Sequence, residues 1–153
     1  MFTPAPFVTR LAFAASDRPE AQEARARLAA RYGEATDDAA QVVVALGGDG
    51  FMLETLHRHI DNPRPIYGMN RGSVGFLMNE YSEDDLLERI NAAERAAIHP
   101  LRMKAVDTNG QTHKALAINE VSLLRQTRQT AKLRISVDSR VRLGELFCDG
   151  ALV

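Results

Sequence analysis

The sequence predicts an α/β domain with a parallel sheet, followed by the start of an antiparallel, all-β domain. In the first part, short apolar runs alternate with segments of helical periodicity, which is typical of a parallel sheet covered by helices. Two of these runs end in glycine-rich turns. From residue 101 onward only strand patterns recur, and Asn109-Gly110 between two of them is a typical hairpin turn. We therefore divide the chain into an α/β domain over 1–98 and a β-rich domain over 99–153.

The first strand and helix follow from local signals. Residues 7–15 (FVTRLAFAA) are mostly apolar and predict a first strand. Asp17 supplies a cap residue for the helix that follows, and a proline suits its first turn. The helix is expected to run to about Tyr32, with Gly33 as its stop.

The next units repeat this order. An unbroken apolar run over 42–46 predicts a buried parallel strand. Helical periodicity over 51–60 follows the first glycine turn, and Pro63 ends it by removing a donor and restricting the preceding residue. A short strand from Ile66 to Met69 then runs into the second glycine loop.

A third helix is predicted after Ser82, because Ser82 and Asp85 have the spacing of a capping box. Its apolar face is formed by Leu86, Leu87, Ile90 and Ala93. The β-rich domain follows, with strand patterns at 101–107, 112–118, 121–125, 131–138 and 141–148.

Composition excludes several classes of protein. A net charge of −1 argues against a nucleic-acid-binding protein, which normally carries a basic excess. The single Cys148 excludes an internal disulfide and fits a reducing compartment. The chain has no run of about 20 apolar residues, as a membrane span needs, and no signal-peptide pattern. We expect a cytoplasmic protein with no nucleic-acid or membrane partner.

The turn Gly47-Gly48-Asp49-Gly50 is the strongest functional signal in the chain. A strand, a glycine-rich turn and a helix N-terminus form a phosphate cradle, because backbone N–H groups and the helix dipole point at the anion. An acid beside phosphates binds a metal, holds a hydroxyl or takes a proton, which indicates phosphoryl transfer. The alternative is a tight turn in which Asp49 is an acid favoured by the helix dipole. The chain has no P-loop motif, and the second glycine loop lacks the dinucleotide-binding spacing.

The second glycine loop is GMNRGSVGFL, over residues 68–77. It follows a strand, so it suits a loop that closes over a ligand, and we include Asn70 and Arg71 among the candidate nucleotide-binding residues. Phe76 is able to stack on a base. The alternative is that Phe76 and Leu77 are core anchors, since most phenylalanines are buried.

Three further polar residues end or interrupt apolar runs. The amide of Asn119 and the carboxylate of Glu120 could contact a base edge and a ribose diol, respectively. The alternative is that the two residues form a solvated turn. Asp149-Gly150 repeats the acid–glycine ending of the first turn, with a simple β-turn as its alternative. The four histidines show no metal-ligand spacing, and we assign no metal-binding residue.

Taken together and in this order, the motifs resemble those of the NAD kinase family in its bacterial form. GGDG with its helix, GMNRGSVGFL, the NE pair and the CDG segment match the N-terminal half of that family over most of residues 40–153. Other families share a GGDG-type loop but are more distant. They are the diacylglycerol kinases, the sphingosine kinases and the phosphofructokinases. The resemblance implies ATP-dependent phosphorylation of the adenosine-ribose 2′-hydroxyl of NAD, which gives NADP.

The resemblance also implies roles for individual residues. Asp49 would hold and deprotonate the 2′-hydroxyl, and Mg²⁺ would arrive with ATP. Phe76 would pack near the adenine. The remaining expected contacts are those of Gly47, Gly48 and Gly50 with phosphates and those of Asn119, Glu120 and Asp149 with the nucleosides of the dinucleotide.

Two features depart from the family pattern. Phe51 stands where many relatives carry threonine, which removes a hydroxyl near the phosphates. The chain also ends at Val153 within a strand pattern, before the nucleotide loop that the family would place next. We therefore expect an incomplete β domain, weak or absent activity of the chain alone, and association into homo-oligomers through exposed strand edges. The alternatives are a non-catalytic nucleotide-binding module and a lipid or sugar kinase of the same superfamily.

Overall fold

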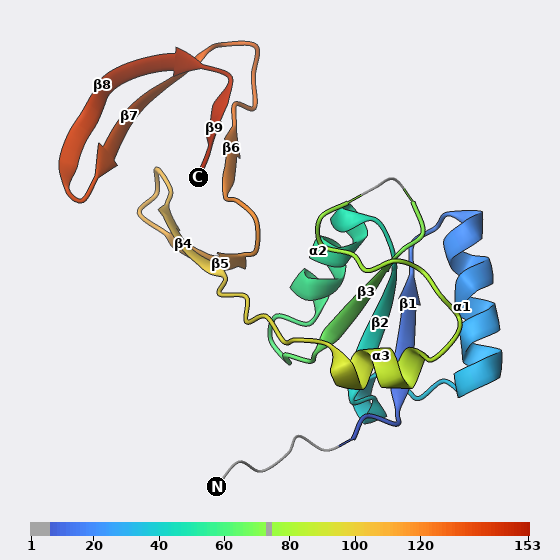
Figure 1. The fold of residues 1–153 in the computed structure, drawn as a ribbon. Coiled ribbons are helices and arrows are strands. Elements are labelled where there is room, and N and C mark those ends of the chain that lie inside the picture. Colours follow the sequence, from blue (N-terminus) through green and yellow to red (C-terminus); the bar gives the residue numbers. More distant parts are fainter. Residues whose placement is uncertain (1–6, 73–74) are drawn as a thin grey trace, which may run out of the picture. The chain divides into compact units, whose positions relative to one another are not determined.

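The computed structural model describes residues 7–72 and 75–153. The chain divides into two compact units, Met1–Ile98 and His99–Val153. Figure 1 shows a parallel sheet with helices in the first unit and strands alone in the second. This arrangement confirms the predicted fold class.

The first unit alternates strands and helices in the predicted order. Its sheet has the order β1-β2-β3, and both strand pairs are parallel. Its elements are β1 (Leu11–Ala15), α1 (Pro19–Tyr32), the 3₁₀ turn η1 (Asp37–Ala39), β2 (Val42–Gly47), α2 (Asp49–Arg58), β3 (Ile66–Asn70) and α3 (Leu86–Ala92).

The start of β1 lies later than the sequence predicts. The expected strand over 7–15 begins only at Leu11. Before it, side chains bind the backbone: the N–H of Val8 donates to Asn91 Oδ1 at 2.8 Å, and that of Arg10 to Gln41 Oε1 at 3.0 Å. The N–H groups of Val8 and Arg10 thus bind side chains rather than the backbone of a neighbouring strand.

Helix α1 has the predicted length but a different cap. Gly33 ends it with φ 75°, a left-handed conformation that favours glycine. The N-cap is Arg18, with no side-chain cap hydrogen bond, so the expectation that Asp17 caps the helix is wrong. Pro19 at the first position has no N–H that needs a cap.

The other two helices begin elsewhere than predicted. Helix α2 starts at Asp49, two residues before the expected 51, so that only Gly48 separates it from β2. The prediction of a capping box at the start of α3 is wrong. Asp85 has φ 51° and is itself the N-cap, so the helix begins only at Leu86. The Ser82 hydroxyl instead accepts the N–H of Asp84 at 3.1 Å.

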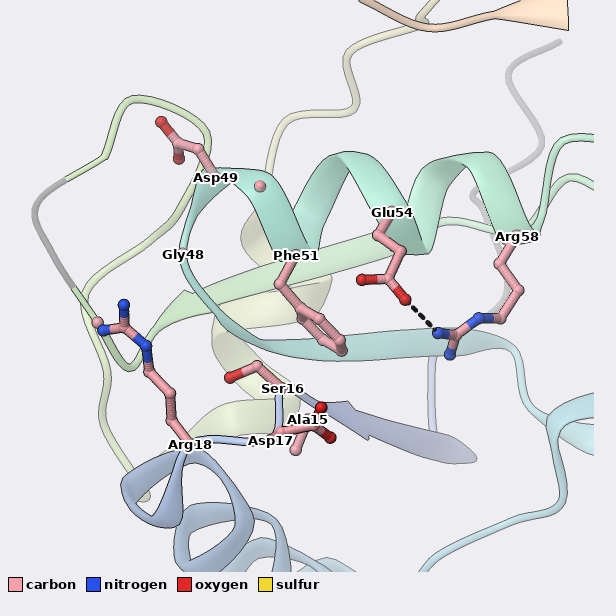
Figure 2. Close-up of a pocket in the computed structure, with 11 residues that line it drawn as sticks. Ala15, Ser16, Asp17, Arg18, Gly48, Asp49, Phe51, Glu54 and Arg58 are labelled. Carbon is pink, nitrogen blue, oxygen red and sulfur yellow. Dashed lines mark hydrogen bonds and ion pairs between the residues drawn. The ribbon is translucent and has the colours of Figure 1, made fainter.

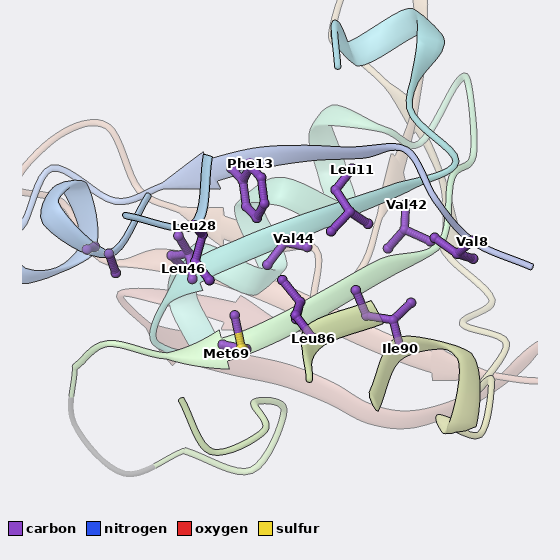
Figure 3. Close-up of a cluster of buried hydrophobic side chains, with 12 residues drawn as sticks. Val8, Leu11, Phe13, Leu28, Val42, Val44, Leu46, Met69, Leu86 and Ile90 are labelled. Atoms are coloured by element: carbon purple, nitrogen blue, oxygen red, sulfur yellow. The ribbon is translucent and has the colours of Figure 1, made fainter. Parts of the chain in front are cut away.

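The core of the first unit lies mainly on one face of the sheet (Figure 3). Leu28 of α1 and Leu86 of α3 are fully buried there with the strand residues. Ala12 and Val43 point to the opposite face. Strand β2 is buried along its whole length, as its unbroken apolar run predicts. The sheet therefore holds the carboxyl ends of its strands rigidly along one edge.

The second unit consists of antiparallel strand pairs. Gly110, with φ 79°, lies in the turn between β4 and β5, at the predicted hairpin. Asp149-Gly150 is not a simple turn, because Gly150 begins a further strand that pairs with β6. The strands are β4 (Leu101–Val106), β5 (Thr112–Ala117), β6 (Ser122–Leu124), β7 (Ala131–Val137), β8 (Arg140–Cys148) and β9 (Gly150–Leu152).

None of the helices within residues 7–72 and 75–153 has the length and hydropathy of a membrane span.

Candidate active site

The two glycine turns meet at the carboxyl edge of the parallel sheet. Gly47, the last residue of β2, is in register with Asn70, the last residue of β3. The N–H of Arg71 donates to the Gly47 carbonyl at 2.7 Å, which joins the two turns directly. Gly48 is the N-cap of α2, so Asp49 lies in the first helical turn beside the second loop.

The Asp49 carboxylate is held by the backbone of the second glycine loop. The N–H of Phe76 donates to Oδ2 at 2.8 Å, and the N–H of Leu77 donates to Oδ1 at 3.0 Å. A Cβ at Gly75 would lie 2.3 Å from Oδ1, so the close approach requires glycine at this position. Each carboxylate oxygen has two lone pairs, which leaves both able to accept one further hydrogen bond.

A pocket of about 560 Å³ opens beside Asp49 (Figure 2). It lies where the carboxyl ends of β1 and β2 meet the first turns of α1 and α2, the usual place for a ligand in such sheets. Its lining residues are Ala15, Ser16, Asp17, Arg18, Gly48, Asp49, Gly50, Phe51, Glu54, Arg58 and Gly72.

Sequence reasoning found Gly48, Asp49 and Gly50 in this lining but missed the turn Ser16-Asp17-Arg18. The missed signal was positional rather than compositional. A turn that follows β1 in a parallel sheet lies at the same edge as the turn that follows β2, whether or not it contains glycine.

Asn70 and Arg71 shape the second loop. Asn70 Oδ1 accepts the N–H of Gly72 at 2.8 Å, which forms a local turn. Arg71 Nε donates to the Glu20 carbonyl in α1 at 3.2 Å, and its guanidinium lies 4.3 Å from the centre of the Tyr81 ring. Neither residue is among those that line the pocket.

Phe76 is fully exposed, at 101% of its reference surface, and Leu77 is 44% exposed. The alternative that these two residues are core anchors is therefore wrong. The residue whose N–H holds Asp49 therefore also presents an exposed aromatic ring that is available to a ligand. Ser73 and Val74 of the predicted loop lie outside the described residues.

The remaining predicted site residues belong to the second unit. Asn119 Nδ2 donates to Glu120 Oε2, so the amide and the carboxylate face each other. Asp149 Oδ1 accepts the Nε–H of Arg125 at 2.6 Å. The sequence alone does not indicate this ion pair with Arg125.

The pocket contains carboxylate oxygens, but the described residues do not form a complete metal-binding site. Over the described part of the chain, no group of three or more His, Cys, Asp or Glu side chains is placed to hold a metal ion. Asp17, Asp49 and Glu54 reach the pocket from separate positions. Such a donor set fits Mg²⁺ that is bound mainly by nucleotide phosphates and water.

A parallel sheet that presents two glycine turns, an acid at a helix N-terminus and a polar pocket is an arrangement typical of α/β domains that bind phosphates. Residues 3–96 match the ATP-NAD kinase N-terminal domain. The chain belongs to the NAD kinase family.

Relatives and a solved structure agree with this assignment. The chain is 76% identical over 153 residues to an NAD kinase of Caulobacter vibrioides, covering 100% of the chain and 59% of that protein. It is 58% identical over 144 residues to an NAD kinase of Hyphomonas neptunium, covering 94% of the chain and 56% of that protein. The crystal structure of yeast NADH kinase complexed with NADH has a similar fold, with a TM-score of 0.71 and 14% identity over 95% of the chain and 57% of the yeast protein. The chain thus spans somewhat more than half the length of these proteins.

Proposed function

We propose that the chain takes part in the phosphorylation of NAD by ATP, at the 2′-hydroxyl of the adenosine ribose, to give NADP. The observation that carries this proposal is the Asp49 carboxylate, held by two backbone N–H groups between two glycine turns beside a pocket. Membership in the NAD kinase family supports the choice of NAD as the acceptor.

In the proposed reaction, Asp49 accepts the proton of the ribose 2′-hydroxyl. The hydroxyl oxygen forms a bond to the γ-phosphorus of ATP, and the bond from that phosphorus to the β,γ-bridging oxygen breaks. ADP leaves with the electron pair of the broken bond. The backbone of the second loop fixes the carboxylate, so that it need not reorganise when it takes the proton. Mg²⁺ that arrives with ATP would neutralise charge on the phosphates.

The glycines of the first turn divide into two roles. A Cβ at Gly47 would lie 2.8 Å from Phe51 Cβ, so Gly47 allows the strand and helix to pack closely. A Cβ at Gly48 or Gly50 would meet nothing within 4 Å. This open space beside the N–H groups of the first helical turn supports a close approach of phosphates to Gly48 and Gly50.

Further contacts are carried over from the family resemblance. Phe76 packs near the adenine, and its full exposure leaves its ring free for this contact. Asn119, Glu120 and Asp149 contact the nucleosides of the dinucleotide. We also propose that the protein is cytoplasmic and forms homo-oligomers.

The test is NADP formation from NAD and Mg·ATP by the chain, compared with an Asp49→Asn variant. Loss of a general base typically lowers turnover by about 10²–10⁴-fold, whereas binding of NAD should persist. Asp61→Asn, an acid in the turn after α2, is the matched control and should leave turnover unchanged.

Equal turnover by the Asp49→Asn variant and the wild type would remove Asp49 from the proposed role. NAD binding by the wild type without turnover would favour the alternative of a non-catalytic nucleotide-binding module. Phosphorylation of a lipid or sugar in place of NAD would assign the chain to another kinase of the superfamily.

A further inference from the structure

Arg18 is a cation of the pocket that has no partner within the described part of the chain. Its guanidinium forms no hydrogen bond or ion pair there. The other cation of the pocket, Arg58, donates to Glu54 at 2.9 Å. The charge of Arg58 is thus already matched, whereas that of Arg18 is not.

The position of Arg18 brings it to the phosphate-binding turn. It is the N-cap of α1, and Figure 2 shows its side chain extending from the first turn of α1 toward Gly48. A Cβ at Gly72 would lie 3.1 Å from Arg18 Nη1 and 3.9 Å from the Gly48 nitrogen. The guanidinium therefore occupies space that Gly72 leaves free, close to the N-terminus of α2.

A second polar group of the pocket also lacks a partner. Ser16 Oγ is buried and makes no hydrogen bond with any described residue. A buried hydroxyl without a partner costs free energy, because it loses its hydrogen bonds to water. A ligand in the pocket would give the guanidinium a partner, and rotation of the Ser16 side chain, which lines the pocket, would bring its hydroxyl to the same ligand.

These observations select a phosphate chain as the ligand. A guanidinium binds phosphate with several N–H donors, a hydroxyl donates one more bond, and the first turn of α2 adds backbone donors. The acids of the pocket do not prevent this: Glu54 is paired with Arg58, and Asp49 is bound to the second loop. Asp17 is the remaining acid, and a divalent cation carried by the phosphates would offset its charge.

We propose that Arg18, assisted by Ser16, binds the phosphate chain of the phosphoryl donor. The proposal rests on the proposed function for the identity of that donor, but not for the binding itself. It assigns a binding role to the turn after β1, at which the sequence shows no phosphate motif.

The test is binding of inorganic tripolyphosphate and of Mg·ATP to the whole chain by titration calorimetry, with NAD as the second ligand. Arg18→Gln should weaken tripolyphosphate and ATP binding by roughly 10- to 100-fold, as expected for loss of charge-assisted hydrogen bonds. NAD binding should change less than about twofold, which is within the usual scatter for a lost contact elsewhere. Ser16→Ala should have a smaller effect in the same direction, and Arg18→Lys should restore part of the loss.

Arg31→Gln is the matched control, since Arg31 lies in the last turn of the same helix and pairs with Asp84 at 2.7 Å. It should bind tripolyphosphate as the wild type does. Equal affinity of Arg18→Gln and the wild type would overturn the proposal, and so would a wild-type chain that binds neither tripolyphosphate nor ATP. If the first result came with NADP formation by the wild type, Arg18 would lose its role while the proposed function stood.

Discussion

Asp49 and Gly75 lie in close contact where the two glycine turns meet. The carboxylate accepts two backbone N–H groups of the second loop, and this approach leaves no room for a side chain at Gly75. The loop and the acid therefore act as one unit. An acid fixed in this way is preorganised for the proposed reaction, so a small displacement should affect NADP formation more than folding.

Gly75→Ala tests this coupling. The added Cβ would lie 2.3 Å from Asp49 Oδ1, so either the carboxylate or the loop must move. We expect NADP formation to fall by about 10²-fold or more, as for a misplaced catalytic group. The free energy of unfolding should fall by no more than about 1–3 kcal/mol, the range of most single substitutions. Turnover and urea unfolding of the variant measure both quantities.

Gly144→Ala is the control for this prediction, because a Cβ at Gly144 would meet nothing within 4 Å. It should leave turnover unchanged and should not lower stability, because alanine is favoured over glycine within a strand such as β8. A Gly75→Ala variant with wild-type turnover would show that the Asp49 contact is not needed for catalysis.

At the residue scale, the sequence predicts which side chains belong to the candidate site better than it predicts what each of them contacts. Asp49 was identified because an acid in a glycine turn is unusual, and Phe76 was assigned either to a ligand or to the core. Only the structure shows that Phe76 is exposed and that its N–H holds Asp49. Arg18 was not identified, because Pro19 beside it indicates only the start of a helix.

At the element scale, hydrogen bonds of the Asp107 carboxylate hold the turn of the β4–β5 hairpin. Asp107 Oδ1 accepts the N–H groups of Asn109 and Gln111, each at 2.9 Å. Its Oδ2 lies 3.1 Å from His113 Nε2 across the hairpin. The hydrogen bond with His113, followed by those of the backbone, lowers the pKa of Asp107 from its ordinary value of 3.8. The ionised carboxylate therefore stabilises the turn.

The lowered pKa of Asp107 predicts that the stability of the hairpin depends on pH. The folded pKa is lower than the unfolded one, so the stabilisation is fully present above the unfolded value of about 4. It is lost as the pH falls through the lower folded pKa. Carbon-detected NMR titration should give Asp107 a midpoint below 3.8. In an Asp107→Asn variant, protection of the hairpin amides should be lower at neutral pH and should no longer decrease between about pH 5 and pH 2. A titration midpoint of Asp107 at or above its ordinary value would show that these hydrogen bonds do not stabilise the ionised carboxylate.

Element types were predictable because each strand and helix has its own periodicity, whereas the ends depended on distant contacts. β1 starts late since Asn91 and Gln41 bind the backbone before it. The sequence indicates a strand at the end of the chain, but the bounds of β9 and its partner follow only from its pairing with β6. These contacts join residues far apart in sequence, which local signals cannot specify.

At the scale of the whole molecule, the two units differ in how they bury apolar side chains. The fully buried residues of the described chain, among them Val44 and Leu46 of β2, all lie in the first unit. In the second unit Leu124 is 76% exposed and Phe147 is 61% exposed. Burial of apolar surface is the main favourable term in folding, so the second unit should be the less stable of the two.

Hydrogen exchange tests this difference. Amides of β2 should exchange slowest, and those of β7 and β8 should exchange at least about 100-fold faster, which corresponds to about 2.7 kcal/mol of opening free energy. The measurement should be repeated at two protein concentrations. If homo-oligomers form through the exposed strands, protection of β6–β9 should rise with concentration while that of β2 stays constant, because association stabilises only what it covers. Equal protection of β2 and β8 in a dilute monomer would show that the second unit is stabilised by something other than buried apolar surface.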